Sequence, residues 1–231
     1  MPIDQPKAPV ITVDGPSGSG KGTVSRIVAQ RLGWHLLDSG ALYRLVALVG
    51  LRDGLAPDDE AAHGLAAERL NAQFGAEGAT ERVWLDGQDV TTELRTERTG
   101  NAASRVAVMP VVRTALLDRQ RAFARSPGLV ADGRDMGTVV FPDAEVKIYL
   151  TASADERALR RHKQLKEKGL DVSLAGLSQE ILERDRRDSS RAVAPLKPAD
   201  GAVVIDSTGL TVESVVDRIL AVARRRLSAS L

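Results

Sequence analysis

The 231-residue sequence contains no cysteine, which excludes disulfide bonds, thiol catalysis and thiolate metal sites. Aromatic residues make up only 3% of the chain and are scattered, which disfavours the stacking surface of a single-strand nucleic-acid binder. The net charge is +1, so the chain lacks the general positive potential of proteins that bind nucleic acids or anionic membranes. Any anion must therefore be bound by a local group of residues.

Long apolar stretches are missing as well. No apolar run reaches 18 residues, and the N-terminal segment MPIDQPKAP has no apolar signal core. Hydrophobic residues nevertheless make up 43% of the chain and charged residues 27%, enough for a sizeable core with a polar surface. The composition predicts one soluble, cytoplasmic globular unit.

Short apolar segments alternate with helical patterns along most of the chain. The alternation favours an α/β fold with a parallel five-stranded sheet and helices on both faces. Between residues 65 and 97 the pattern changes to short alternating segments around Asp86-Gly87, which predicts a small β-containing insert with a hairpin. The predicted strands are 10–14, 35–38, 128–133, 145–150 and 201–207, and the predicted helices include 21–33, 39–51, 110–125 and 212–226.

The turn after the first predicted strand reads GPSGSGKGT and lies between a buried strand and a helix N-terminus, as a phosphate-binding loop requires. Its glycines let backbone N–H groups face an anion, and Lys21 adds a mobile positive charge. A plain glycine-rich turn is the alternative, but the spacing, the lysine and the hydroxyl group together disfavour it. The residues expected to bind the ATP phosphates are Gly15, Pro16, Ser17, Gly18, Ser19, Gly20, Lys21, Gly22 and Thr23.

The loop departs from its commonest form at Gly22, where a Ser or Thr usually ligates Mg²⁺. Thr23 follows one position later. We therefore expect Mg²⁺ to be held mainly by phosphate oxygens and water, with Asp132, at the end of a predicted strand, as an outer-sphere partner. This departure points away from switch GTPases and transport ATPases.

Four segments together resemble bacterial cytidylate kinases, which belong to the nucleoside monophosphate kinase family of P-loop proteins. They read ITVDGPSGSGKGT, WHLLDSGALYR, ADGRDMGTVVFPDA and RDRRDSSRAVAPL, and the resemblance covers nearly the whole chain. It implies ATP-dependent phosphorylation of CMP and dCMP by a monomer. It also implies a single domain over 1–231, with a core of 10–54, 97–150 and 200–231, an NMP-binding insert at 65–97 and a lid region at 155–190.

The resemblance assigns the acceptor nucleotide to specific residues. The CMP phosphate would be bound by Ser39, Tyr43, Arg44 and Arg134. Asp135 would accept a hydrogen bond from the cytosine amino group, and uracil would place a carbonyl there instead. Further base contacts are implied for Ser104, Arg113 and Arg191. Taken without the resemblance, the same residues fit ordinary roles such as a helix cap, a core tyrosine and a surface arginine.

The segment ERDRRDSSR, residues 183–191, holds four arginines and three acids. If residues 175–190 are helical, Arg184, Arg187, Asp188 and Arg191 share one face, while Asp185 and Arg186 lie elsewhere. The resemblance assigns Arg184 and Asp188 to the sugar, and Arg187 suits the transferring phosphate. The alternative is a solvated charged surface, which we expect for Asp185 and Arg186.

Residues 151–170 would form the lid, with Arg157 and Arg161 contacting adenine and phosphate. The alternative is a solvated amphipathic helix, which we expect for Arg160, Lys163 and Lys166. The catalytic charges implied are Lys21, Arg134, Arg161 and Arg187. No general base is required, because the acceptor phosphate is already anionic. Two alternative hypotheses are a kinase for another small acceptor and a regulatory module that binds nucleotide without turnover.

Overall fold

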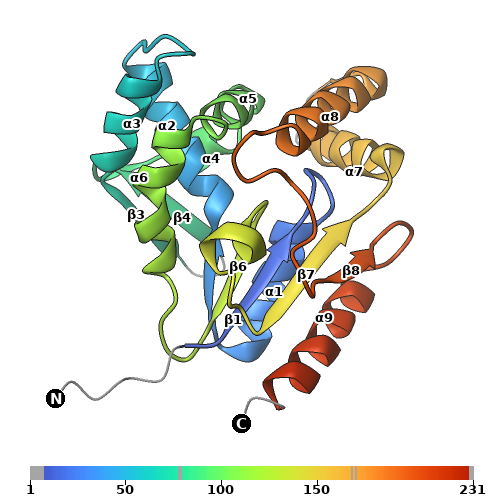
Figure 1. Cartoon of the computed structure of the whole chain (residues 1–231). Coiled ribbons are helices and arrows are strands. Elements are labelled where there is room, and N and C mark those ends of the chain that lie inside the picture. Colours follow the sequence, from blue (N-terminus) through green and yellow to red (C-terminus); the bar gives the residue numbers. More distant parts are fainter. Residues whose placement is uncertain (1–7, 78–79, 168, 170, 229–231) are drawn as a thin grey trace, which may run out of the picture. The chain divides into compact units, whose positions relative to one another are not determined.

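A computed structural model describes the chain from residue 8 to residue 228, apart from residues 78–79, 168 and 170 (Figure 1). The chain divides into two compact units. The first comprises Met1–Asp38 and Gln120–Leu231, and the second comprises Ser39–Arg119.

The first unit contains the predicted parallel sheet. Its strand order is β2-β6-β1-β7-β8, and all neighbouring strands are parallel, which confirms the predicted fold class. All five residues of β1 are buried, because the strand lies at the centre of the sheet and is covered on both faces. The strands are β1 Val10–Asp14, β2 His35–Asp38, β6 Leu129–Gly133, β7 Val146–Thr151 and β8 Val203–Asp206.

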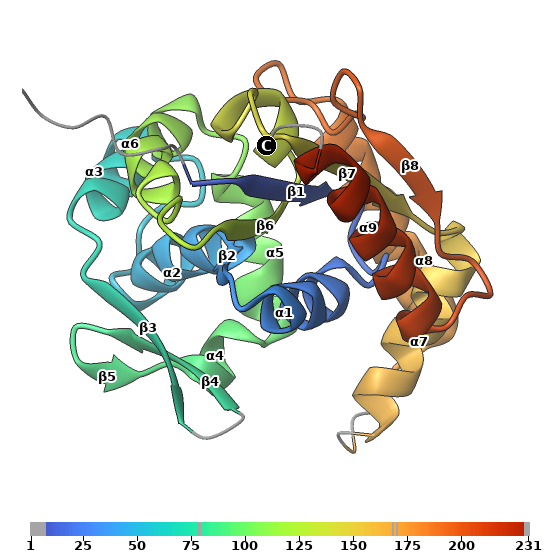
Figure 2. The same ribbon diagram turned by 90° about the horizontal axis from the view of Figure 1, so that it is seen from below.

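Helices α1 (Lys21–Leu32) and α9 (Val212–Leu227) pack against the sheet and against each other (Figure 2). The apolar sides of these helices and of the central strands form the core of this unit. Gly33 ends α1 with a φ of 66°, a left-handed conformation that glycine adopts without strain. Helices α7 (Ala154–Glu167) and α8 (Leu174–Ser189) pack against each other, and a single π-helical turn, η1 (Met136–Val140), lies against β1 and β6.

The second unit combines helices with a small antiparallel sheet of order β3-β4-β5. The predicted hairpin is confirmed: Asp86 and Gly87 join β4 to β5, with φ angles of 50° and 78°. Helix α2 packs on α3 and α5. The elements are α2 Ser39–Arg52, α3 Glu60–Glu68, β3 Ala72–Glu77, β4 Thr80–Leu85, β5 Gln88–Asp89, α4 Thr91–Leu94 and α5 Glu97–Val106, followed by α6 Pro110–Arg121.

Several predicted boundaries were wrong. Residues 65–68 belong to α3 rather than to the β-containing insert, because Asp59 caps this helix by accepting a hydrogen bond from the Ala62 N–H. Helix α6 ends at Arg121 instead of residue 125. The division into units also differs from the expected core, because α2 and residues 97–119 group with the small sheet.

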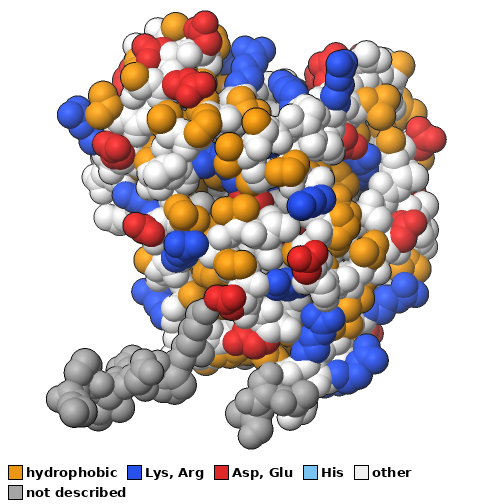
Figure 3. Space-filling model, in the orientation of Figure 1, with side chains coloured by type: hydrophobic (Ala, Val, Ile, Leu, Met, Phe, Trp, Pro, Cys, Tyr) orange, Lys and Arg blue, Asp and Glu red, His pale blue; other side chains and the backbone are white. Residues whose placement is uncertain are grey.

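Charged side chains of both signs are interspersed with apolar ones on the face shown in Figure 3. This mixture agrees with the near-zero net charge. Within the part of the chain that the structure describes, no helix has the length and apolar character needed to cross a membrane.

Candidate functional site

The glycine-rich loop joins β1 to α1 and curls back on itself. Gly15, Gly18 and Gly20 have φ angles of 148°, 77° and 92°, which side chains on L-residues strongly disfavour. Lys21 is 5% exposed, and its Nζ donates to the carbonyl oxygen of Pro16 at 2.8 Å. The loop therefore holds an ammonium group at the N-terminus of α1, where backbone N–H groups attract anions.

Gly15 is the most constrained glycine of the loop. A Cβ atom there would lie 2.0 Å from the carbonyl oxygen of Leu150, which is backbone and cannot move aside. We expect Gly15→Ala to destabilise the protein by about 3 kcal/mol or more, through overlap added to an unfavourable φ. Urea unfolding measures this loss.

Gly33→Ala is the matched control for this change. Gly33 also has a positive φ, of 66°, but a Cβ atom there would meet nothing within 4 Å. Its cost should be about 1 kcal/mol. Equal losses for the two variants would contradict the proposed overlap with Leu150.

Charges of both signs surround Lys21. Burial lowers the pKa of Lys21 below its ordinary value, and the charge of Arg134 lowers it further, while Asp132 and Asp14 oppose the shift. Burial likewise raises the pKa of Asp132, against the attraction of Lys21. These acids and cations share one poorly solvated region at the ends of β1 and β6.

The structure gives a reason for Gly22, the position at which the loop departs from its commonest form. A Cβ atom at Gly22 would lie 3.3 Å from Oδ2 of Asp132. The strand end thus brings a carboxylate to the place where a Ser or Thr side chain would otherwise begin. No group of three or more metal-ligating side chains occurs among the described residues.

Three predicted acceptor-site residues form one ion-paired group. Arg134 Nε donates to Oδ2 of Asp188 at 3.0 Å, and Arg191 donates to Oδ1 of the same carboxylate. Burial would raise the pKa of Asp188, but the guanidinium groups of Arg134 and Arg191 more than offset it and hold the pKa below its ordinary value. Arg191 lies just beyond the end of α8 and still reaches Asp188 within the helix.

The other arginines of α8 face a largely positive environment. Burial lowers the pKa of Arg184, Glu180 opposes the shift, and the charges of Arg134 and Arg187 add to the lowering. Burial lowers the pKa of Arg161 as well, and Arg184 contributes to that shift. The buried Nε of Arg187 has no hydrogen-bond partner within the described part of the chain. A group of partly desolvated guanidinium ions of this kind suits an anionic ligand.

Arg157 is engaged by the protein itself. Its Nε donates to the Ala152 carbonyl and its Nη1 to the Ser17 carbonyl, both at 3.0 Å. Its two Nη atoms also form a bidentate pair with Asp185, at 3.0 and 2.6 Å. The assignment of Asp185 to the solvated side was therefore wrong, because the packing of α7 on α8 turns this carboxylate toward Arg157. The contact of Arg157 with adenine remains a prediction.

Arg160 was also misassigned to the solvated surface. Its Nη2 donates to the Ser207 carbonyl at 2.7 Å, and its Nη1 donates to Oγ of Ser207 at 3.1 Å. Nη1 also approaches the carbonyl oxygen of Ser19, at 3.4 Å. Arg160 therefore joins α7 to the phosphate-binding loop and to the segment after β8. Lys163 and Lys166 are exposed, as expected.

The second unit brings together other predicted acceptor residues. The guanidinium carbon of Arg113 lies 5.8 Å from the centre of the Tyr43 ring, and Nη1 of Arg113 donates to the Ala107 carbonyl at 3.1 Å. Arg44 donates to the Leu94 carbonyl at 2.7 Å. Among the residues that the structure describes, the buried hydroxyl oxygen of Ser104 has no hydrogen-bond partner.

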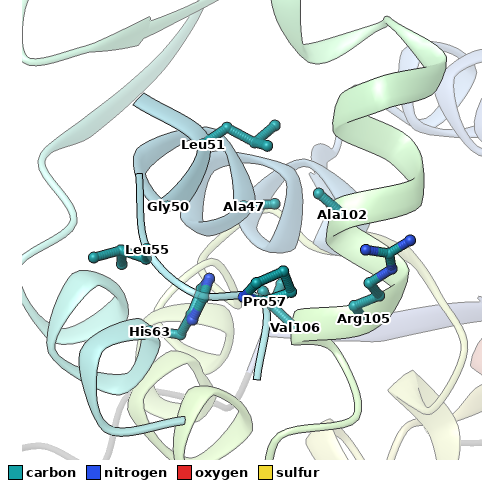
Figure 4. Close-up of a pocket in the computed structure, with 9 residues that line it drawn as sticks. All are labelled: Ala47, Gly50, Leu51, Leu55, Pro57, His63, Ala102, Arg105 and Val106. Atoms are coloured by element: carbon teal, nitrogen blue, oxygen red, sulfur yellow. The ribbon is translucent and has the colours of Figure 1, made fainter. Parts of the chain in front are cut away.

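A small pocket of the second unit lies between α2, α3 and α5 (Figure 4). Its lining is mostly apolar, with His63 and Arg105 as the charged or polar members. None of the predicted acceptor residues lines it. On α5 the pocket is lined by Ala102, Arg105 and Val106, whose spacing puts them on one face of the helix, and Ser104 lies off that face. The pocket is therefore not part of the predicted nucleotide site.

Comparison with known proteins decides the family. The family model for cytidylate kinase matches residues 11–225. A curated cytidylate kinase from Stutzerimonas stutzeri is 60% identical over 223 residues, which cover 95% of this chain and 97% of that protein. One from Aeromonas salmonicida is 57% identical over 220 residues, covering 95% and 96%. The chain belongs to the cytidylate kinase family.

Among solved structures, a shikimate kinase from Acinetobacter baumannii matches with a TM-score of 0.46 and 17% identity, over 97% of this chain and 96% of that one. A likeness this low supports no functional statement. The family assignment depends on the family model and the sequence relatives, and it confirms the resemblance that the motifs predict.

Within this cytidylate kinase fold, the first unit gathers Lys21, Asp132, Arg134 and Asp188 around the ends of β1 and β6. The second unit gathers Tyr43 with Arg113. The individual ligand contacts of these residues remain predictions.

Sequence reasoning missed the interactions of three residues: Asp14, whose charge acts on Lys21, Asp185, which pairs with Arg157, and Ser207, which accepts from Arg160. For Asp14 a signal exists, because an acid ends an otherwise apolar buried strand. Asp185 and Ser207 have no such local signal, since their partners lie 28 and 47 residues away.

Proposed function

We propose that the chain transfers the γ-phosphoryl group of ATP to CMP and dCMP, giving ADP with CDP or dCDP. The observation that carries this proposal is the group of arginines around Asp188, beside the lysine of the phosphate-binding loop. Lys21 would bind the donor phosphates, and Arg134 and Arg191 would bind the acceptor. This arrangement fits a kinase whose acceptor is itself anionic.

The reaction requires positioning and charge stabilisation rather than proton abstraction. An oxygen of the CMP phosphate attacks the γ-phosphorus, and the bond from that phosphorus to the bridging oxygen breaks, so the electron pair leaves with ADP. Lys21, Arg134, Arg161 and Arg187 would stabilise the negative charge on the transferring group. Because these side chains are partly desolvated, their attraction for phosphate is stronger than in water.

The acceptor base would be selected by a few buried polar groups. Asp135, which is 3% exposed, would accept a hydrogen bond from the cytosine amino group, with Arg113, Ser104 and Arg191 as donors to the base. Uracil would leave two acceptors facing each other, and unpaired buried polar groups can lower kcat/KM by orders of magnitude. The acceptor phosphate would be bound by Ser39, Tyr43, Arg44 and Arg134, and the sugar by Arg184 and Asp188.

The donor side would use the loop 15–23 together with Arg157 and Arg161. Mg²⁺, held by ATP phosphates and water with Asp132 as an outer-sphere partner, would neutralise phosphate charge. For Arg157 to contact adenine, its guanidinium would have to exchange Asp185 for the nucleotide. We further expect a monomer in the cytoplasm.

The direct test offers CMP, dCMP, UMP, AMP and GMP in turn with ATP and Mg²⁺, and measures ADP release. Rapid turnover with CMP and dCMP alone is expected. Comparable turnover with AMP would favour a kinase for another acceptor. Absence of turnover with every acceptor, while ATP still binds, would favour a regulatory nucleotide-binding module.

Arg191→Ala tests the base contact. We expect its KM for CMP to rise by about 10- to 100-fold, because a charged hydrogen bond to the base is lost, while the affinity for ATP changes little. Titration of each nucleotide separately measures the two affinities. Similar losses for CMP and ATP would contradict the placement of Arg191 at the base.

A further inference from the structure

Asp14, the last residue of β1, is a buried acid that the proposed reaction does not use. Asp14 is only 2% exposed. Oδ1 accepts a hydrogen bond from the Met136 N–H and Oδ2 accepts one from the Gly137 N–H, each at 2.8 Å. Both oxygens of the carboxylate are therefore committed to the first backbone groups of η1.

The backbone of Asp14 also lies beside the residue that precedes Arg134 and Asp135. In the parallel pairing of β1 with β6, Asp14 is in register with Gly133. Arg134 and Asp135 are the only residues between Gly133, which the sheet fixes, and Met136, which the carboxylate fixes. The two residues expected to bind the acceptor phosphate and base are thus positioned from both sides by Asp14.

Close packing leaves this turn little freedom. A Cβ atom on Gly137 would lie 2.8 Å from Oγ1 of Thr12 and 3.3 Å from Oδ2 of Asp14. The Asp135 carbonyl accepts hydrogen bonds from the N–H groups of Val139 and Val140, at 2.9 and 3.2 Å, which places Asp135 in the hydrogen-bonded start of η1. A shift at residues 136–137 would therefore be transmitted to Asp135.

An acid at this depth is costly. Burial raises the pKa of Asp14 to about 6, although the Gly137 and Met136 N–H groups lower it, and nearby Asp135 raises it further. An apolar residue would fill the same space without that cost, but it would leave two buried N–H groups unsatisfied. The carboxylate is needed specifically because it accepts two hydrogen bonds at once.

We propose that Asp14 is a positioning residue that sets acceptor selectivity by holding the turn that carries Arg134 and Asp135. This inference rests on the proposed function, because selectivity is measured with CMP as the acceptor. Asp14 touches neither substrate, and it holds the turn through its hydrogen bonds to the backbone of residues 136 and 137.

Asp14→Asn tests the proposal. The amide keeps the size of the side chain but turns one acceptor into a donor, so one backbone N–H loses its partner. We expect the KM for CMP to rise by about 10- to 100-fold, as a misplaced binding group would cause. We also expect the preference for CMP over UMP, as a ratio of kcat/KM, to fall at least about tenfold. The affinity for ATP without acceptor should change by less than about twofold.

Thr12→Val is the matched control. Thr12 is buried on the same strand and lies against the same turn, and its Oγ1 has no hydrogen-bond partner among the residues described. It should keep the wild-type KM for CMP and the wild-type preference. A merely structural role for Asp14 would lower thermal stability but leave the CMP-to-UMP ratio unchanged, and that result would overturn the inference.

These experiments distinguish a failure of the proposal for Asp14 from a failure of the proposed kinase activity. Wild-type protein that fails to phosphorylate CMP would overturn the proposed function, whatever Asp14 does. If Asp14→Asn does not fold, Gly137→Ala displaces the same turn from the other side, through Thr12. It should show the same acceptor-specific loss, and an unchanged CMP-to-UMP preference in that variant would overturn the inference.

Discussion

Lys21→Met is expected to reduce kcat for CMP phosphorylation on the order of 10³-fold or more. The methionine keeps the length of the side chain and removes its charge. Lys21 already lies at the N-terminus of α1 in the glycine-rich loop, with Nζ bonded to the Pro16 carbonyl. Without that ammonium group, the negative charge that develops on the transferring phosphoryl group would lose the stabilisation expected from Lys21.

The same variant should be at least as stable as the wild type at pH 7. Burial lowers the pKa of Lys21 below its ordinary value of 10.5, so the folded state disfavours the charged form that the unfolded chain prefers at neutral pH. That cost is greatest below the folded-state pKa and disappears as the pH rises toward the unfolded value. The stability gained by Lys21→Met should therefore shrink between neutral pH and about pH 10.

Steady-state kinetics and urea unfolding of ligand-free protein measure the two effects on one preparation. A large loss of kcat together with an unchanged or higher free energy of unfolding would show that Lys21 serves the reaction and not the fold. A variant that loses stability at pH 7, or that retains more than about a tenth of wild-type kcat, would contradict this account. Lys163→Met, at an exposed position of α7, is the control and should change neither quantity.

The sheet could be predicted from the sequence because its strands are short, apolar and separated by strong turn signals. The run VITVD is fully buried, and the Asp-Gly pair at 86–87 forms the hairpin that its chemistry favours. The division into units could not be predicted in the same way. Helix α2 is apolar on most of its surface, so its pattern does not reveal which elements cover it.

The part of the candidate site that lies in one continuous motif could be predicted from the sequence. The part whose residues are brought together only by folding could not. The loop 15–23 is continuous in sequence, so its lysine and glycines could be read directly. The pairing of Arg157 with Asp185 joins two helices, and the pairing of Arg160 with Ser207 joins a helix to the segment after β8. Periodicity places each residue on a face of its own helix, but it does not say which other element faces it.

Asp188→Ala is expected to destabilise the protein by about 3–5 kcal/mol, the range for breaking a buried ion pair by removing one partner. Asp188 is 4% exposed and is shared by Arg134 and Arg191. Its removal would leave two guanidinium groups close together without their common counter-charge. The KM for CMP should also rise, since both arginines would lose the geometry that the carboxylate imposes. Urea unfolding and acceptor kinetics measure these losses.

The pH dependence of that loss distinguishes an ion pair from lost packing. The pKa of Asp188 is held below its ordinary value of 3.8, so its stabilising effect is present above that value and is lost as the pH falls through the lower folded-state pKa. The stability difference between wild type and Asp188→Asn should therefore be largest near neutral pH and shrink below about pH 4. Asp217→Asn, which breaks an exposed pair with Arg31, should change the stability far less, because water screens that pair. A difference for Asp188→Asn that stays constant from pH 7 to pH 3 would show that the carboxylate acts through its shape and not through its charge.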